Sequence, residues 1–194
     1  MRRRALLVSA LTAASAVTAG CSTVEPRTEH TNPVEKTSDD PRDDEKYLEF
    51  PGDGGDLAVV GVDPRFSPLP EHFHTWISHA EDTELQSLTQ RFVAPDGDGT
   101  PPQLSLEGPF MGDAEPHPSV SLYRDDGAAV VEVHRFGELA DETVFINFPV
   151  IRWPESSRRV VVENTVELVR SGLLDRTHVL DGRLEFSAET DGSD

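Results

Sequence analysis

Short runs of alternating apolar and polar residues, separated by turn signals about every ten residues, constrain the fold of this chain most. The clearest pair, residues 119–123 and 129–134, flanks Asp126-Gly127. An Asp-Gly step between alternating runs is a strong β-hairpin signal. This spacing, without a convincing long helix, predicts an all-β fold, and we expect an immunoglobulin-like or related antiparallel β-sandwich of roughly seven to nine strands.

Four other segments have strand patterns. Residues 57–62 are a β-branched apolar run closed by Asp63-Pro64, and residues 104–106 alternate after a turn-forming stretch. Residues 72–78 place histidine, tryptophan and serine on one face and apolar residues on the other, so the apolar face should pack inward. Residues 143–153 are apolar on both faces, which is typical of a central strand.

Two segments fit both a helix and a strand. Residues 160–169 carry an apolar stripe with helical spacing, but their valine content favours a strand, which we adopt. In the other segment both spacings stay open, so one short helix near residues 83–92 belongs to the expectation. We expect Ser171-Gly172 and Asp181-Gly182 to turn the chain into a C-terminal meander.

The first residues predict export. Arg2-Arg3-Arg4 is followed by an uncharged run from Ala5 to Ala19. That run is shorter than the roughly 20 residues of a membrane-spanning helix, so we expect a cleaved signal peptide over residues 1–20. Arg3-Arg4 before an apolar pair also has the form of a twin-arginine export signal, while three arginines would equally suit an ordinary basic start.

Cys21 is the predicted site of lipid attachment. It is the one cysteine of the sequence, so it forms no intramolecular disulfide, and it follows Ala19-Gly20 as in a lipobox. Thr18 stands where a lipobox commonly has leucine. We expect a lipid on Cys21 to anchor the protein to the extracellular face of the cell membrane.

The composition is strongly acidic. The net charge is −19, and removal of residues 1–20, which carry three arginines and no acid, would make it −22. Such a surface repels nucleic acid and anionic lipid. Only two lysines accompany fifteen arginines. With Arg3-Arg4 and Cys21, this bias makes the chain resemble a haloarchaeal exported lipoprotein of the twin-arginine type, a resemblance that implies a location and no activity.

The composition also divides the chain. Residues 21–49 are rich in charges and prolines, which predicts a disordered, lipid-anchored tether. Residues 50–187 have the size of one β-sandwich domain, and residues 188–194 are expected to form a disordered tail.

Two groups of residues are candidate metal ligands. His72 and His74 lie two positions apart on one strand face, with His79 nearby, and imidazoles so placed could bind zinc or copper. Asp96 and Asp98 alternate with glycines, as in a fragment of a calcium loop, although the full calcium-binding pattern is absent. Solvated polar surface is the simpler interpretation of both groups, so no cofactor is required.

Known catalytic patterns are missing from the sequence. It contains no G-x-S-x-G, no S-x-x-K and no glycine-rich phosphate loop. Trp76 and Tyr123 are among the aromatic residues that could line a binding surface, although such residues more often belong to a core. We therefore expect a non-catalytic binding or interaction domain, with a metal-binding surface protein using His72 and His74 as the alternative and a secreted hydrolase as a more remote one.

Overall fold

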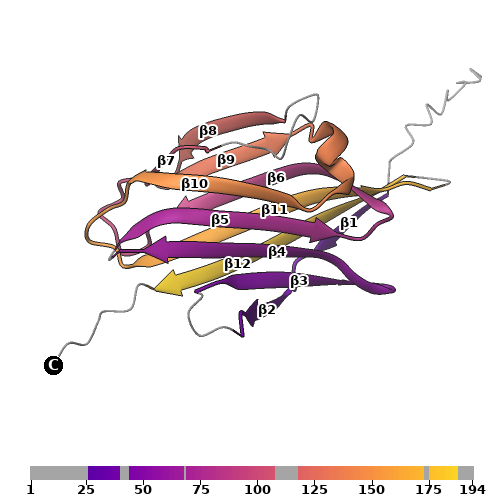
Figure 1. Cartoon of the computed structure of the whole chain (residues 1–194), viewed down its shortest axis with the longest axis horizontal. Coiled ribbons are helices and arrows are strands. Elements are labelled where there is room, and N and C mark those ends of the chain that lie inside the picture. The colour runs from indigo at the N-terminus through magenta and orange to yellow at the C-terminus, as the bar shows by residue number, and fades with distance from the viewer. Residues whose placement is uncertain (1–25, 40–43, 68, 108–117, 173–174, 188–194) are drawn as a thin grey trace, which may run out of the picture.

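Two six-stranded sheets pack face to face in the computed structural model (Figure 1). The structure describes residues 26–39, 44–67, 69–107, 118–172 and 175–187. The first sheet has the order β1-β12-β11-β6-β9-β8 and the second the order β2-β3-β4-β5-β10-β7. The elements are β1 (Arg27–His30), β2 (Val34–Thr37), β3 (Lys46–Gly52), β4 (Gly55–Phe66), β5 (Pro70–His79), β6 (Thr83–Val93), β7 (Gln103–Leu104), β8 (Ser119–Asp125), β9 (Ala128–His134), the 3-10 helix η1 (Gly137–Asp141), β10 (Val144–Arg152), β11 (Arg159–Arg170) and β12 (Arg176–Ser187).

The antiparallel β-sandwich expected from the sequence is confirmed. Among the described residues, β1 with β12 is the one parallel pair. Twelve strands are present in that part of the chain, more than the seven to nine expected. The excess comes from short edge strands: β1 and β2 have four residues each and β7 has two.

One hydrophobic core fills the space between the sheets. Alternate side chains of β4 and β5 meet those of β6, β9 and β11, so the inward residues of each strand are almost fully buried. Phe73 and Phe92 lie 4.9 Å apart between ring centroids, and Phe148 and Trp153 pack beside them. Such aromatic contacts add about 0.5–1.5 kcal/mol per pair beyond burial alone.

Several sequence predictions of strands are confirmed. β8 and β9 form the expected hairpin, in which Asp126 and Gly127 occupy the turn with φ of 43° and 76°. Residues 160–169 lie within β11, as the valine content indicated. In β5 the buried positions include Phe73 and Ile77, whereas Trp76 faces outward.

The expected disordered tether over residues 21–49 is wrong where the structure describes it. β1 extends the first sheet beside β12, β2 extends the second beside β3, and β3 begins at Lys46. β1 and β2 are short, and most of their side chains are exposed, so their sequences show no apolar alternation. Main-chain pairing with a neighbouring strand holds them in place. The domain therefore begins at Arg27, while residues 21–25, 40–43 and the expected tail at 188–194 lie outside the described residues.

Two local expectations are also wrong, and a third, the central position of residues 143–153, is confirmed. Residues 83–92 form strand β6, without a helix, because Leu88 and Phe92 alternate into the core while the segment pairs with β11 and β9. β4 continues through Asp63-Pro64 instead of ending there. β10 lies between β5 and β7, as expected for a central strand, although Phe145 and Ile151 on its outer face are 38% and 67% exposed.

Asp181-Gly182 makes no turn, since β12 runs straight through it. A Cβ atom at Gly182 would lie 2.5 Å from Leu48 Cδ1 and 3.3 Å from Phe50 Cζ. Glycine is thus required here by the close approach of the facing sheet. β11 does end at Arg170, next to the expected turn at Ser171-Gly172, and it pairs antiparallel with β12 so that Glu167 lies opposite Val179.

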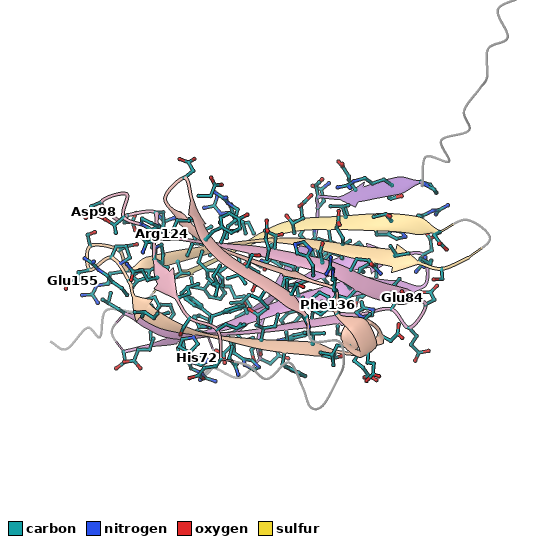
Figure 2. The ribbon with its side chains drawn as sticks, turned by 90° about the horizontal axis from the view of Figure 1, so that it is seen from above. His72, Glu84, Asp98, Arg124, Phe136 and Glu155 are labelled. Carbon is teal, nitrogen blue, oxygen red and sulfur yellow. The ribbon has the colours of Figure 1, made fainter. Side chains whose placement is uncertain are left out.

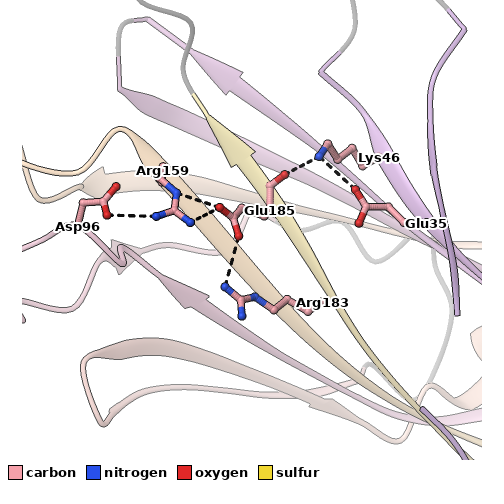
Figure 3. A network of polar contacts seen from close by, with 6 residues as sticks. All are labelled: Glu35, Lys46, Asp96, Arg159, Arg183 and Glu185. Carbon is pink, nitrogen blue, oxygen red and sulfur yellow. Dashed lines mark hydrogen bonds and ion pairs between the residues drawn. The ribbon is translucent and has the colours of Figure 1, made fainter. Parts of the chain in front are cut away.

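A polar network joins the two sheets where β3 lies near β12 (Figure 3). Lys46 Nζ donates to the Glu185 backbone oxygen at 2.7 Å and to the Glu35 carboxylate at 3.1 Å. The Glu185 carboxylate accepts from Arg159, and this bond holds the pKa of Glu185 below its usual value. Arg159 also reaches Asp96 at 3.3 Å. Because these ion pairs are largely exposed, each contributes about 1 kcal/mol or less.

Candidate binding surface

An aromatic row crosses the outer face of the second sheet. Tyr47 of β3 pairs in register with Gly61 of β4, Gly61 pairs with Trp76 of β5, and Trp76 pairs with Phe145 of β10. We call Tyr47, Trp76 and Phe145 the aromatic row. Figure 1 shows β3, β4, β5 and β10 side by side; β4 supplies Gly61 and the other three strands supply the aromatic residues. The row depends on register between strands, because each strand supplies a single member.

Gly61 lets the Trp76 indole lie flat on the sheet. A Cβ atom built at Gly61 would stand 2.1 Å from both Cε2 and Nε1 of Trp76. Carbon atoms in contact are normally about 3.5–4.0 Å apart, so no larger residue could stand beneath the ring in this position. One face of the indole therefore covers the backbone of β4, and Trp76 as a whole is half-buried.

A hydrogen bond and a neighbouring ring fix the indole further. Trp76 Nε1 donates to Glu45 Oε1 at 2.5 Å. The Tyr47 ring lies beside it, with centroids 6.2 Å apart and planes at 43°. The indole is thus held at its edge and on one face before any ligand binds. Binding to its other face therefore costs less side-chain entropy.

A polar row lies next to the aromatic row on the same sheet face. Asp63 of β4, His74 of β5 and Asn147 of β10 pair in register, and we call these three residues the polar row. Asp63 forms an ion pair with Arg65 at 2.7 Å. His74 Nδ1 donates to Asn147 Oδ1, and the His74 ring stacks on Phe145 with centroids 5.8 Å apart.

The hydrogen bond between His74 and Asn147 assigns their remaining polar atoms. Because a carbonyl oxygen only accepts, Nδ1 carries the hydrogen and the neutral ring presents Nε2 as an acceptor. Asn147 uses Oδ1 in this bond, and its amide nitrogen carries two donors. The polar row therefore offers both donors and acceptors along one side of the aromatic row.

The structure does not assemble the predicted histidine metal site. His72 and His74 do share the outer face of β5, but His79 Nδ1 contacts Thr83 Oγ1 at 2.9 Å at the far end of the strand. Across the described ranges, no group of three or more histidine, cysteine or acidic side chains could hold a metal ion. The structure therefore does not bring His79 to His72 and His74, and a metal on the His72–His74 pair stays a prediction.

Asp96 and Asp98, the predicted calcium ligands, make separate polar contacts in the structure. Asp96 faces Arg159 in the polar network. Asp98 instead accepts from the Thr100 backbone N–H at 3.0 Å, and hydrogen bonding to Thr100 lowers the pKa of Asp98. Figure 2 shows His72 and Asp98 on separate parts of the molecule. The two aspartates thus serve a cation pair and a turn, and their oxygens do not converge.

The cavities found among the described residues lie away from the aromatic row. One lies beside the β3–β4 turn and Arg170, and another lies between Asp98 and Glu155 at the end of the sandwich seen in Figure 2. A third is lined by Leu122, Tyr123 and Ile151 near the edges formed by β8 and β7. Tyr47, Trp76 and Phe145 line none of these three cavities.

A second group of exposed side chains provides a comparison surface. Leu122 and Tyr123 of edge strand β8 are 45% and 44% exposed. Tyr123 Oη donates to Glu132 Oε1 at 2.6 Å, and this bond raises the pKa of Tyr123. This tyrosine has no glycine-backed ring or neighbouring polar row of the kind found at Trp76.

Sequence reasoning missed most of the candidate surface. It placed His72, His74 and Trp76 on one outward face, which is confirmed. The predicted tether included Tyr47, although the apolar residues Leu48 and Phe50 lie two positions apart and are the alternating signal of a strand. The predicted export residues Arg3, Arg4 and Cys21 lie outside the described residues. Within the described part of the chain, no helix is long and apolar enough to cross a bilayer.

Comparison with known proteins identifies a family. No curated protein matches the chain. The reeler domain of human F-spondin is similar over 69% of this chain and 88% of its own length, with 10% identity and a TM-score of 0.38. A collagen-binding domain from a Staphylococcus aureus adhesin is similar over 58% of this chain and 89% of its own, with 10% identity and a TM-score of 0.27. The model of a family described as a domain of unknown function, DUF8121, matches residues 27–190, most of the chain, and the protein therefore belongs to that family.

Proposed function

We propose that this protein is an exported, lipid-anchored binding protein of the cell surface, and that its β-sandwich binds a partner non-catalytically through the aromatic row. The observation that carries the binding function is the indole of Trp76, laid on Gly61 and hydrogen-bonded to Glu45. Aromatic residues dominate binding energy at recognition surfaces because they supply large contact areas at a low entropic cost.

The N-terminal sequence supports the location. Arg3-Arg4, the uncharged run and Cys21 follow the order of an export signal with a lipid attachment site. Residues 22–26 separate Cys21 from the first residue of β1. Even fully extended, five residues reach roughly 18 Å, so the sandwich would stand close to the bilayer instead of at the end of a long tether.

This arrangement would direct one end of the sandwich toward the membrane. β1 runs parallel to β12, and Arg27 at its start lies beside Thr177 near the β11–β12 turn. The aromatic row lies on the broad face of the second sheet, so anchoring through Cys21 would leave that face pointing sideways along the cell surface. A partner at the same height in the cell envelope could therefore reach it.

A labelling experiment tests the anchor. Cells that express the full chain are fed a radioactive lipid precursor, and membranes are compared between the wild type and Cys21→Ala. We expect label and membrane retention in the wild type and in Trp76→Ala, and the loss of both in Cys21→Ala. Unchanged membrane retention of Cys21→Ala without label in the wild type would refute the anchor.

A sedimentation experiment tests the binding surface without knowledge of the partner. Purified full chain with Cys21→Ala in every variant is mixed with isolated envelopes of the native host at the salt concentration of growth. We expect Trp76→Ala to reduce the retained fraction about tenfold or more, as for a central aromatic anchor. Tyr123→Ala, on the comparison surface, should bind like the parent. Equal binding by the Trp76→Ala variant would refute the proposed function.

A further inference from the structure

We infer that the ligand of the aromatic row is a neutral polysaccharide chain, an inference that rests on the proposed binding function. The surface has the shape, polarity and charge that such a chain requires. Each of these properties comes from the described residues of β3, β4, β5 and β10.

The shape of the surface favours an extended ligand. Small-molecule sites are concave and enclose most of their ligand, whereas the aromatic row follows residues paired in register across the outer face of a sheet and lines none of the three cavities described above. From β3 to β10 the aromatic row crosses three strand gaps, which makes it roughly 14 Å long. It is one residue wide, since the polar row flanks it on one side and Glu49, Val59 and Ser78 pair in register on the other. A linear chain matches this outline better than the broad apolar centre of a protein interface.

The chemistry of the surface matches sugar rings. A pyranose has faces of C–H groups, which pack on the π-face of an aromatic ring, and an edge of hydroxyl groups. The exposed face of Trp76 and the 38% exposed Phe145 can take the C–H faces. His74 Nε2 can accept from hydroxyls and the Asn147 amide can donate to them, as their mutual hydrogen bond assigns.

The charge of the surface selects a neutral chain. The Glu45 carboxylate lies beside the aromatic row, and the nearby cations Arg65 and Lys36 are already paired with Asp63 at 2.7 Å and Glu49 at 3.7 Å, so neither cation is left to bind an anionic chain. The whole chain carries −19. An anionic polymer would be repelled by this field unless salt screened it, whereas a neutral chain is indifferent to it.

Selective destruction of envelope glycans tests the inference. Envelopes are treated with periodate, which cleaves the vicinal diols of sugars, or with protease, and then used in the sedimentation experiment. We expect periodate to lower retention of the parent protein about tenfold, to the level of Trp76→Ala, and protease to leave it unchanged. Phe145→Ala should also bind weakly. Because the Phe145 ring is partly exposed, its removal should lower the free energy of unfolding less than removal of a buried ring would.

The outcomes separate this inference from the proposed function. If retention depends on Trp76 but survives periodate and is lost on protease treatment, the ligand is a protein, and the inference is overturned while the proposed function stands. If retention is the same for the parent and Trp76→Ala, both fail. Retention on heparin–agarose but not on unmodified agarose at the same salt would contradict the neutral character of the ligand.

Discussion

Gly61→Ala is the sharpest perturbation of the candidate surface, because it adds one methyl group beneath an indole. The added Cβ would stand 2.1 Å from Trp76 Cε2 and Nε1. Restoring a normal contact of about 3.6 Å requires the ring to move by roughly 1.5 Å. Such a movement separates Nε1 from Glu45 Oε1, now 2.5 Å away. The ring can swing outward because its other face borders solvent, so we expect the fold to survive.

The cost in stability should be modest. Loss of a hydrogen bond to a charged group costs about 1.5–3 kcal/mol, with the lower end appropriate at a half-exposed site. Replacing glycine by alanine inside a strand returns roughly 0.5–1 kcal/mol. The net decrease in the free energy of unfolding should therefore be about 0.5–1 kcal/mol, which leaves the protein folded.

Tryptophan fluorescence measures this effect directly. Trp153 is only 4% exposed and gives a constant background, whereas Trp76 reports the change. We expect a red-shifted emission and stronger acrylamide quenching in Gly61→Ala, together with weak envelope binding. Gly54→Ala is the matched control, since a Cβ there meets no atom within 4 Å. Unchanged emission and full binding in Gly61→Ala would refute the reasoning.

Three further predictions concern stability. Gly182→Ala should lower the free energy of unfolding by about 1–3 kcal/mol, measured by denaturant titration, because its Cβ would overlap Leu48; wild-type stability would contradict the packing argument. Burial lowers the pKa of His178, whose Nδ1 lies 3.0 Å from His30 Nε2. The unfolded chain therefore binds more protons than the folded protein near pH 6, and the free energy of unfolding should fall as the pH drops below about 6.5. His178→Gln should flatten this pH dependence in thermal unfolding, and an equally steep profile would exclude His178 as its source. Lys46→Ala should lower stability by about 1 kcal/mol, less so at molar salt, and a loss independent of salt would argue against an electrostatic contribution.

The sequence predicted those parts of the fold whose signals are local. Asp126-Gly127 marks its hairpin because few residue pairs accept two positive φ values in succession. β5 and β11 are long enough for their alternation or valine content to decide between strand and helix. β1 and β2 could not be predicted in this way, since they bury few of their own side chains and depend on main-chain pairing with β12 and β3.

The candidate surface depends on strand order, which local patterns do not contain. Phe145 joins Trp76 only because β10, far along the chain, pairs with β5. In the sequence, Gly61 is one member of an apolar run, and nothing there indicates that the Trp76 indole lies on it. Asp181-Gly182 has the composition of a turn, but its glycine serves close packing between the sheets.

Oxidative footprinting tests the central claim most directly, because it reports which side chains a bound partner covers. The full chain with Cys21→Ala is exposed to hydroxyl radicals with and without host envelopes, and modification is quantified by mass spectrometry. We predict that Tyr47, Trp76 and Phe145 become protected in the presence of envelopes while Tyr123 reacts at the same rate. Protection of Tyr123 without protection of Trp76 would show that the partner binds at the β8 edge and would contradict the account.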